Sequence, residues 1–221
     1  IMNDYGKIMS AAEAVSRVKD GDRIMVGGFG PTGAPYRLVE ALFDSGKKNL
    51  TIISNGPNPA GKGVSRLVEN RQVKSMIGNF YNVNKELVRA YNRGEIEVTL
   101  VPQGTFAEAI RAGGAGIPAF YVEASAGTQL AEGKESRIFN GKECVLEYAL
   151  TAEVALIQAY KADRLGNLIY SKTARNFNPL MATAAAFTVV QVEKIVPIGS
   201  LNPDAIITPH LYVDAIVEVT K

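Results

Sequence analysis

The chain has 221 residues and a formal net charge of +2, with 47% hydrophobic and 21% charged residues. This balance is typical of a globular protein and gives no electrostatic reason to expect binding to nucleic acid or to a membrane surface. A single cysteine, Cys144, excludes a disulfide framework, and a single histidine, His210, excludes a Cys/His zinc cluster, so we expect no metal. We find no apolar run of membrane-spanning length and no signal-peptide pattern, and the expected location is the cytoplasm.

The first half of the chain alternates between strand and helix patterns. Ser10 and Glu13 form a capping box that opens a short helix, with Val15 and Val18 on one face. Beyond it the patterns predict strands at 23–28, 49–54, 73–78 and 96–102, and helices at 36–46, 63–70, 85–94 and 105–113. Because helical segments separate the strands, we expect an α/β fold with a mainly parallel, helix-covered sheet.

From about Pro118 the pattern changes. Asn140-Gly141 lies between two strand-like runs and predicts a hairpin, and 154–170 reads as two strands joined by a glycine-containing loop. A helix rich in small residues at 179–187 and strands at 188–193 and 211–219 follow. We expect an appended β-rich region, antiparallel or mixed. No linker or repeat interrupts the chain, so residues 1–221 are predicted to form a single domain.

A glycine-rich stretch follows the first predicted strand. Gly28, Gly30 and Gly33 spell G-x-G-x-x-G, the fingerprint of a dinucleotide-binding turn. Such a site needs an acidic residue about twenty positions later, at the end of the second strand, to bind a ribose hydroxyl. Residues 53–56 occupy that position, read I-S-N-G and contain no acid. A nicotinamide or flavin site is therefore disfavoured.

A second phosphate-like motif spans residues 56–63 and matches G-x-x-x-x-G-K-[ST] at every position except the last. Gly63 replaces the hydroxyl that would bind magnesium, and Pro57 and Pro59 lack backbone donors that such a loop uses. The better interpretation of Lys62 is a turn followed by the start of a helix.

A longer pattern around the same glycines is more specific. Residues 20–35 read D-G-D-R-I-M-V-G-G-F-G-P-T-G-A-P. This stretch resembles the signature of the family I coenzyme A (CoA) transferases at every fixed position. The segments 101–121, 161–170 and 174–185 are similar to the α subunit of 3-oxoacid and acetate CoA-transferases. The resemblance runs from about Ser10 to Val219, although His210 stands where glycine is common.

The resemblance implies a reaction in which a carboxylic acid and an acyl-CoA exchange CoA, with CoA as a substrate and no permanently bound cofactor. In this family a glutamate attacks the thioester, and a glutamyl-CoA thioester follows. The family's β subunit holds that glutamate in a Ser-Glu-Asn-Gly turn after the second strand. This chain has Ser54 at the corresponding place, and Glu69, at a predicted helix end, is a poor substitute. We therefore expect the half of the enzyme without the nucleophile, which forms a heterotetramer with a β subunit.

Two groups of residues are candidates for the site. The predicted CoA- or substrate-binding residues are Gly27, Gly28, Phe29, Gly30, Pro31, Thr32 and Gly33. The predicted catalytic residue is Gln103, in a supporting role, because its neutral amide follows a strand at the carboxyl end and matches an active-site glutamine of the family. The alternative interpretations are a strained turn packed against the partner for the glycines, and a glutamine that holds a tight turn for Gln103.

Other residues are expected to have structural roles. Gly113, Gly114 and Gly116 suggest a helix end followed by a loop that could form a wall of the site. The segment 175–178 reads as an ordinary helix N-terminus and stays outside the predicted site. Cys144 is predicted to be a small buried hydrophobe, and His210 a structural or surface residue.

The expected substrates are a short-chain acyl-CoA, such as succinyl-CoA, and a 3-oxoacid or short-chain carboxylate, such as acetoacetate. Exchange with acetate, butyrate or 3-oxoadipate is the nearest alternative. A non-catalytic module that binds CoA esters or sugar phosphates is an alternative of another class, and a dinucleotide-dependent oxidoreductase is the third choice.

Overall fold

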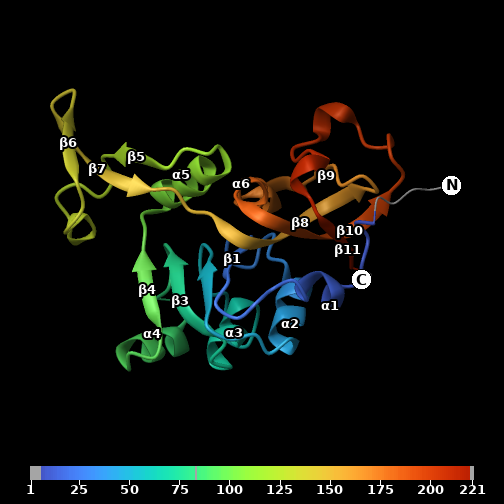
Figure 1. Cartoon of the computed structure of the whole chain (residues 1–221), viewed down its shortest axis with the longest axis horizontal. Helices are drawn as coiled ribbons and strands as arrows, with labels where there is room; N and C mark the ends of the chain where they lie inside the picture. Colours follow the sequence, from blue (N-terminus) through green and yellow to red (C-terminus); the bar gives the residue numbers. More distant parts are fainter. Residues whose placement is uncertain (1–5, 83, 220–221) are drawn as a thin grey trace.

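The computed structural model describes residues 6–82 and 84–219 (Figure 1). The strands of the main sheet are β1 (Arg23–Val26), β2 (Leu50–Ile53), β3 (Val73–Gly78), β4 (Glu97–Leu100), β8 (Ala152–Asp163), β10 (Ala185–Val196) and β11 (Ala215–Glu218), together with the short β9 (Leu168–Ile169). They follow the order β11–β10–β8–β1–β2–β3–β4, and all neighbours in this order pair in parallel. The predicted parallel α/β sheet is therefore confirmed, with β9 antiparallel to β8.

Helices cover both faces of this sheet. One face carries α1 (Ala11–Val15), α2 (Tyr36–Asp44), α3 (Val64–Glu69) and α4 (Lys85–Asn92), and the other carries α5 (Gln103–Gly114) and α6 (Asn178–Thr183). The alternation of side chains along β1 follows this division. Ile24 and Val26 pack into the core beneath α1 to α4, whereas Met25 packs into the core beneath α5 and α6. The strands β1, β2 and β8 are thus mostly buried on both sides, as strands of parallel sheets usually are, whereas the edge strand β4 is largely exposed.

The N-terminal helix begins as the capping box predicts. The Ser10 hydroxyl accepts a hydrogen bond from the Glu13 backbone N–H at 3.2 Å. The helix ends at Val15, so Val18 lies beyond it, and both valines are nevertheless buried in the same core. The apolar spacing therefore identified the buried face correctly but overestimated the length of the helix.

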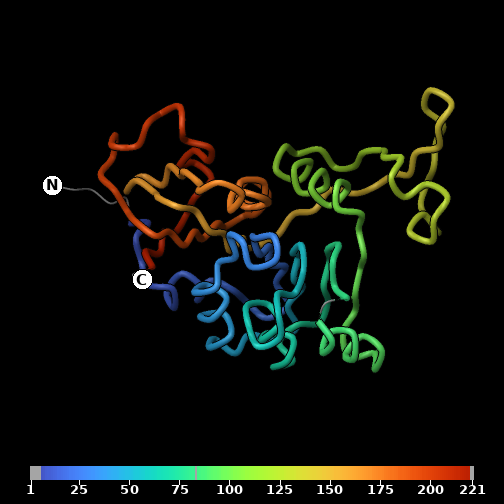
Figure 2. The backbone as a smooth tube through the Cα atoms, turned by 180° about the vertical axis from the view of Figure 1, so that it is seen from behind, coloured from blue at the N-terminus to red at the C-terminus, as the bar shows by residue number. Residues whose placement is uncertain are grey.

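The chain after α5 forms a second, smaller sheet. Its strands are β5 (Ala119–Val122), β6 (Ser136–Phe139) and β7 (Lys142–Tyr148), antiparallel in the order β5–β7–β6. Asn140 and Gly141 turn the β6–β7 hairpin with φ angles of 52° and 78°, as an Asn-Gly hairpin requires. The hairpin projects from the body at the end opposite β9 and β10 in Figures 1 and 2. The appended antiparallel region is confirmed here and at β9.

The last long strands differ from the antiparallel alternative, because β8, β10 and β11 join the main sheet in parallel with β1. The reason is the crossover through α6, which returns the chain to the same edge before β10 begins. The predicted helix at 179–187 ends at Thr183, and Ala185 already pairs with Ala152 of β8. Strand pairing thus overrides the helical propensity of the alanines.

The carboxyl ends of β1 to β4 lie along one edge of the sheet, as they must in parallel pairing. The loops that leave this edge contain the glycine-rich stretch, residues 54–56, residues 79–82 and the segment before α5. Short 3-10 turns occur elsewhere, at Gln129–Ala131, Lys172–Arg175, Pro203–Ala205 and His210–Tyr212. Within residues 6–82 and 84–219, no helix has the length and apolarity that crossing a membrane requires.

Candidate active site

The glycine-rich loop leaves β1 and forms a tight turn over residues 29–32. The Phe29 N–H donates to the Thr32 carbonyl at 2.9 Å, and the Thr32 N–H donates to the Phe29 carbonyl at 3.1 Å. Gly30 turns the chain with φ of 55°, and nothing lies within 4 Å of a Cβ built on it. Phe29, Pro31 and Thr32 are exposed. The tip of the loop therefore offers side chains and backbone to an incoming molecule.

The glycines at the base of the loop face the protein itself. A Cβ on Gly27 would lie 1.8 Å from the Asn178 Oδ1 atom, and one on Gly33 would lie 2.3 Å from the Ala174 carbonyl oxygen. Gly28 is similarly close to Ala34, at 2.9 Å. Close contact with residues 174–178, and with Ala34 of the same loop, thus explains why these three positions are glycine. Their predicted role in binding a ligand stays a prediction.

The N-terminus of α2, where a dinucleotide phosphate would bind, already has a partner. The Gln191 Oε1 atom, which belongs to β10, accepts hydrogen bonds from the Arg37 N–H at 3.0 Å and the Leu38 N–H at 3.3 Å. Pro35 precedes the helix and provides no side-chain cap. A side chain 154 residues further along the chain therefore caps α2. This arrangement gives a structural reason, besides the missing acid, to reject the dinucleotide interpretation.

The second phosphate-like motif is likewise occupied by contacts within the chain. The Asn58 amide accepts from the Val64 N–H at 3.2 Å and donates to the Gly30 carbonyl at 2.8 Å, so it joins this segment to the glycine-rich loop. The Glu69 carboxylate accepts from the Gly61 N–H at 3.0 Å. A carboxylate bound inside the loop would repel phosphate. The motif is therefore a turn before α3, and the structural interpretation of Lys62 is favoured.

The turn after β2 contains no nucleophilic carboxylate. Ser54 is 3% exposed, and its hydroxyl donates to the Gly56 carbonyl at 3.2 Å. The Asn55 amide donates to the Asn79 Oδ1 atom at 2.9 Å, and the Asn55 carbonyl accepts from the Phe80 N–H at 3.1 Å. These bonds join the turn after β2 to the turn after β3. The backbone of residues 54–56 is thus well anchored, but its side chain at position 54 is a hydroxyl and not a carboxylate.

Gln103 begins α5, two residues before the predicted start of this helix at residue 105. Its side chain is exposed and has no hydrogen-bond partner among the residues that the structure describes. The first turn of α5 has no side-chain cap, and the Thr105 hydroxyl is buried without a partner in the described part of the chain. Gln103 therefore does not hold a turn, and its amide is free to bind a ligand.

The loop segments along this edge of the sheet carry no charged side chain. The segments 27–33, 54–56, 79–82 and 101–104 contain no acidic and no basic residue. The described residues also hold no group of three His, Cys, Asp or Glu side chains arranged to bind a metal ion. The edge can donate hydrogen bonds to a carboxylate or to a thioester oxygen, but its own loops supply no charged nucleophile.

One contributor to the site escaped the sequence analysis. The Asn176 Nδ2 group donates to the Thr32 carbonyl at 3.0 Å, and the Asn178 Nδ2 group donates to the Gly33 carbonyl at 3.0 Å. The segment 176–178 thus holds the glycine-rich loop from about 145 residues away. Two asparagines before a helix are also an ordinary N-terminal signal, so local sequence provides no reason to connect them with the loop.

The remaining candidates have structural roles. Gly113 and Gly114 end α5, where added Cβ atoms would lie 2.1 Å from the Leu150 carbonyl oxygen and 2.1 Å from the Thr183 hydroxyl. These two glycines therefore permit close packing, whereas Gly116 is exposed after the helix and has a φ of 73°, so the predicted wall stays a prediction. Cys144 is buried in β7, as predicted. The His210 backbone binds Lys7 and Asn167, which fits a structural residue.

Fold and site together define a class of protein: a parallel α/β protein whose sheet edge presents uncharged hydrogen-bond donors on loops that contain no acidic residue. The model of the coenzyme A transferase family matches residues 8–219. The chain therefore belongs to the coenzyme A transferase family.

Two curated relatives and one solved structure illustrate the similarity. The chain is 50% identical over 209 residues to the A subunit of succinyl-CoA:3-ketoacid coenzyme A transferase from Helicobacter pylori, covering 95% of this chain and 90% of that protein. It is 44% identical over 211 residues to the alpha subunit of acetate CoA-transferase from Escherichia coli, covering 96% of each. An Escherichia coli acyl-CoA transferase, solved as a thioester complex with CoA, has the same fold with a TM-score of 0.87 at 22% identity.

The share of each relative's length that this chain covers differs between the solved structure and the curated relatives. The match covers 96% of this chain but only 49% of the Escherichia coli acyl-CoA transferase chain, so the present chain spans about half the length of that chain. The curated relatives, in contrast, are each named as one of the subunits of their enzymes.

Proposed function

We propose that this chain is the subunit of a CoA-transferase that lacks the nucleophile, and that it acts with a β subunit that supplies a glutamate. The observation that carries the proposal is the uncharged edge of the sheet, where Gln103 has no hydrogen-bond partner among the described residues and the turn after β2 holds Ser54 and no carboxylate. A site of this kind favours an incoming carboxylate, because it provides donors without a second negative charge.

The reaction exchanges CoA between two acids: R-CO-SCoA + R′-COO⁻ ⇌ R-COO⁻ + R′-CO-SCoA. The partner's glutamate attacks the thioester carbonyl and releases the CoA thiolate, which leaves an acyl-glutamyl anhydride. The thiolate then attacks the glutamyl carbonyl, releases R-COO⁻ and forms a glutamyl-CoA thioester. The second acid reverses these steps.

The residues of this chain would contribute binding and hydrogen bonds. The Gln103 amide would donate to the oxygen that gains negative charge during each attack. The exposed tip formed by Phe29, Gly30, Pro31 and Thr32 would contact the CoA ester, while Gly27, Gly28 and Gly33 give the loop its path. CoA is a substrate in this scheme, and no permanently bound cofactor takes part.

We infer that the substrates are a short-chain acyl-CoA such as succinyl-CoA and a 3-oxoacid such as acetoacetate. Support comes from the 50% identity to a relative named for succinyl-CoA and 3-ketoacids. Acetate is the alternative acceptor, because a relative named for acetate is 44% identical over the same region. We also infer one domain over residues 1–221, a heterotetramer with two copies of each chain, and a cytoplasmic location, which the unpaired Cys144 supports.

Assays of the chain with and without its partner test the proposal. The purified chain should transfer no CoA from succinyl-CoA to acetoacetate, and addition of the β subunit should start turnover. Acetate and 3-oxoadipate are tested as acceptors in the same assay, and their turnover is compared with that of acetoacetate. Turnover by the chain alone, or none from the complex with any of these acids, would contradict the proposal.

A further inference from the structure

Phe177 lies between the two elements that carry the predicted site residues. Its ring stacks on Phe29, at the tip of the glycine-rich loop, with centroids 6.4 Å apart and planes 2° from parallel. It also forms a T-shaped contact with Phe106 of α5, with centroids 5.3 Å apart and planes at 72°. Phe106 is three residues after Gln103 on the same helix. Three rings therefore connect the loop tip to the helical turn that carries Gln103.

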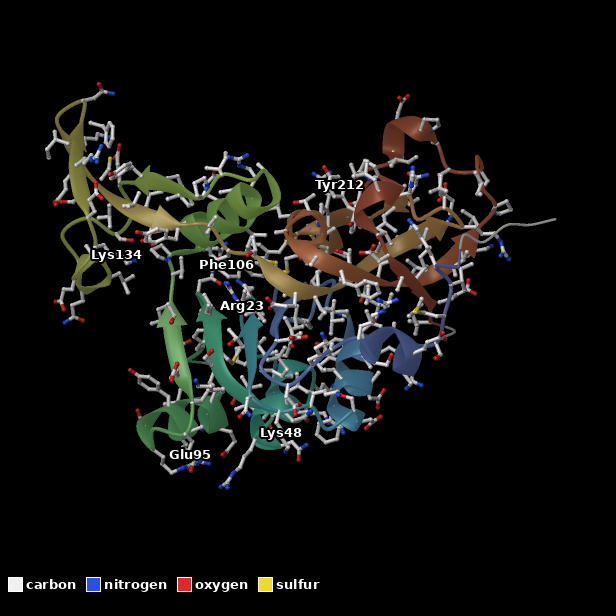
Figure 3. All side chains as sticks on the ribbon, viewed as in Figure 1. Arg23, Lys48, Glu95, Phe106, Lys134 and Tyr212 are labelled. Atoms are coloured by element: carbon white, nitrogen blue, oxygen red, sulfur yellow. The ribbon has the colours of Figure 1, made fainter. Side chains whose placement is uncertain are left out.

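The buried end of this ring contact is firmly held. Phe177 is 6% exposed and Phe106 is completely buried. Phe106 belongs to the core beneath α5 and α6 and lies between α5 and the central strands (Figure 3). Edge-to-face and offset-stacked rings have preferred geometries, so the position of Phe106 constrains Phe177, and Phe177 in turn constrains Phe29.

The asparagines on either side of Phe177 fix its backbone. The Asn178 Oδ1 atom accepts from the Gln158 N–H of β8 at 3.0 Å, while its Nδ2 group binds the Gly33 carbonyl. The Asn176 Nδ2 group binds the Thr32 carbonyl, and its Oδ1 atom accepts from the Phe177 N–H at 2.7 Å. The ring of Phe177 and the backbone of the glycine-rich loop are thus attached to the same strand of the sheet.

Burial in the core does not explain the position of the Phe29 ring. Phe29 is 47% exposed, yet its ring lies nearly parallel to that of Phe177. A half-exposed ring gains less from burial than a core residue does. What the stack provides is a defined position for the loop tip relative to α5.

We propose that Phe177 is a positioning residue for CoA transfer: it holds the glycine-rich loop at a fixed distance and orientation from Gln103. The inference rests on the proposed function, which requires the loop and the Gln103 amide to act on one CoA ester. Small displacements of groups that act together reduce turnover steeply, by up to about 100-fold for about 1 Å. Phe177 touches neither substrate nor the reacting atoms in this scheme.

Substitution Phe177→Leu tests the role in the complex with the β subunit. It removes both ring contacts and keeps an apolar side chain of similar size. We expect kcat to fall about tenfold or more, because the glycine-rich loop and Gln103 are then no longer held in a fixed position relative to each other. The matched control is Phe43→Leu on α2, whose ring packs against the opposite core and beneath the Arg66 guanidinium, 4.0 Å away.

Both leucine variants should lower the thermal midpoint, since each loses a partly or fully buried ring. Only Phe177→Leu should reduce kcat in the folded complex at a temperature below both midpoints. Equal kcat values for the two variants would overturn the proposal, because they would leave Phe177 as a core residue only.

A second measurement does not depend on activity. The chain contains no tryptophan, so Phe29→Trp places a single fluorophore at the loop tip of the full chain. Adding Phe177→Leu should lower the fluorescence anisotropy of the fluorophore at position 29, whereas adding Phe43→Leu should leave it unchanged. Equal anisotropy in all three proteins would overturn the positioning role. Failure of the wild-type complex to transfer CoA would instead contradict the proposed function.

Discussion

At the scale of single residues, Gln103 and Ser54 determine what the candidate site can and cannot do. Gln103 presents a neutral amide without a partner among the described residues, shortly after the carboxyl end of β4, whereas Ser54 holds a buried hydroxyl that is already bonded to the Gly56 carbonyl. An amide can stabilise developing negative charge, but a buried and engaged hydroxyl without an adjacent base is a poor nucleophile. Under the proposed function, this chain therefore supplies hydrogen bonds, and the partner subunit supplies the nucleophile.

Substitution of Gln103 tests this assignment. Gln103→Ala, assembled with the β subunit, should lower turnover by about 100-fold through loss of one oxyanion donor. Gln103→Glu should be at least as damaging, because its carboxylate would repel both the attacking glutamate and the substrate acid. Assembly, measured by size-exclusion chromatography, should be unchanged. Gln129→Ala, which alters an exposed glutamine in a 3-10 turn, serves as the control. Wild-type kinetics in Gln103→Ala would remove Gln103 from the site.

At the scale of elements, the loops along the sheet edge are held by residues distant in sequence. Gln191 of β10 caps α2, Asn58 joins two loops, and Asn178 joins the glycine-rich loop to β8. Such contacts convert flexible glycine-rich sequence into a defined surface. They also occupy the helix N-termini that a phosphate would otherwise use, so the two phosphate-like motifs lack the free donors that their patterns suggest.

Removal of the α2 cap should reduce stability measurably. Gln191→Leu has a similar volume but leaves the Arg37 and Leu38 N–H groups without an acceptor, and it should cost about 1–2 kcal/mol of unfolding free energy. For a chain of this size, the thermal midpoint should fall by about 2–8 °C. Gln129→Leu, at an exposed position, should change the midpoint little. Equal midpoints for Gln191→Leu and the wild type would show that the cap contributes nothing to stability.

At the scale of the whole molecule, local sequence patterns were sufficient to predict the parallel first half of the fold. Strand and helix alternation up to α5 predicted the order of elements, and Asn140-Gly141 predicted the hairpin, because each depends on nearby residues. The parallel pairing of β8, β10 and β11 depends on which edge the chain returns to after α6. No local pattern encodes that choice, and the alanines at 184–186 even favour helix.

In the candidate site, too, local sequence predicted some features and only the folded chain revealed the others. The glycine-rich loop and Gln103 were predicted from motifs, and the absence of a carboxylate after β2 was visible in the sequence. The contacts of Phe177 and Asn178 with the glycine-rich loop, and of Gln191 with α2, join residues about 145 positions or more apart, so only the folded chain reveals them.

The central claim is that the reactive carboxylate belongs to another chain, and covalent trapping tests it most directly. The complex with the β subunit is incubated with succinyl-CoA alone, and both polypeptides are then studied by mass spectrometry after denaturation and proteolysis. We expect a CoA thioester on a glutamate of the β subunit, whereas the present chain should stay unmodified, at Glu69 in particular. A CoA thioester on any glutamate of the present chain would contradict the claim.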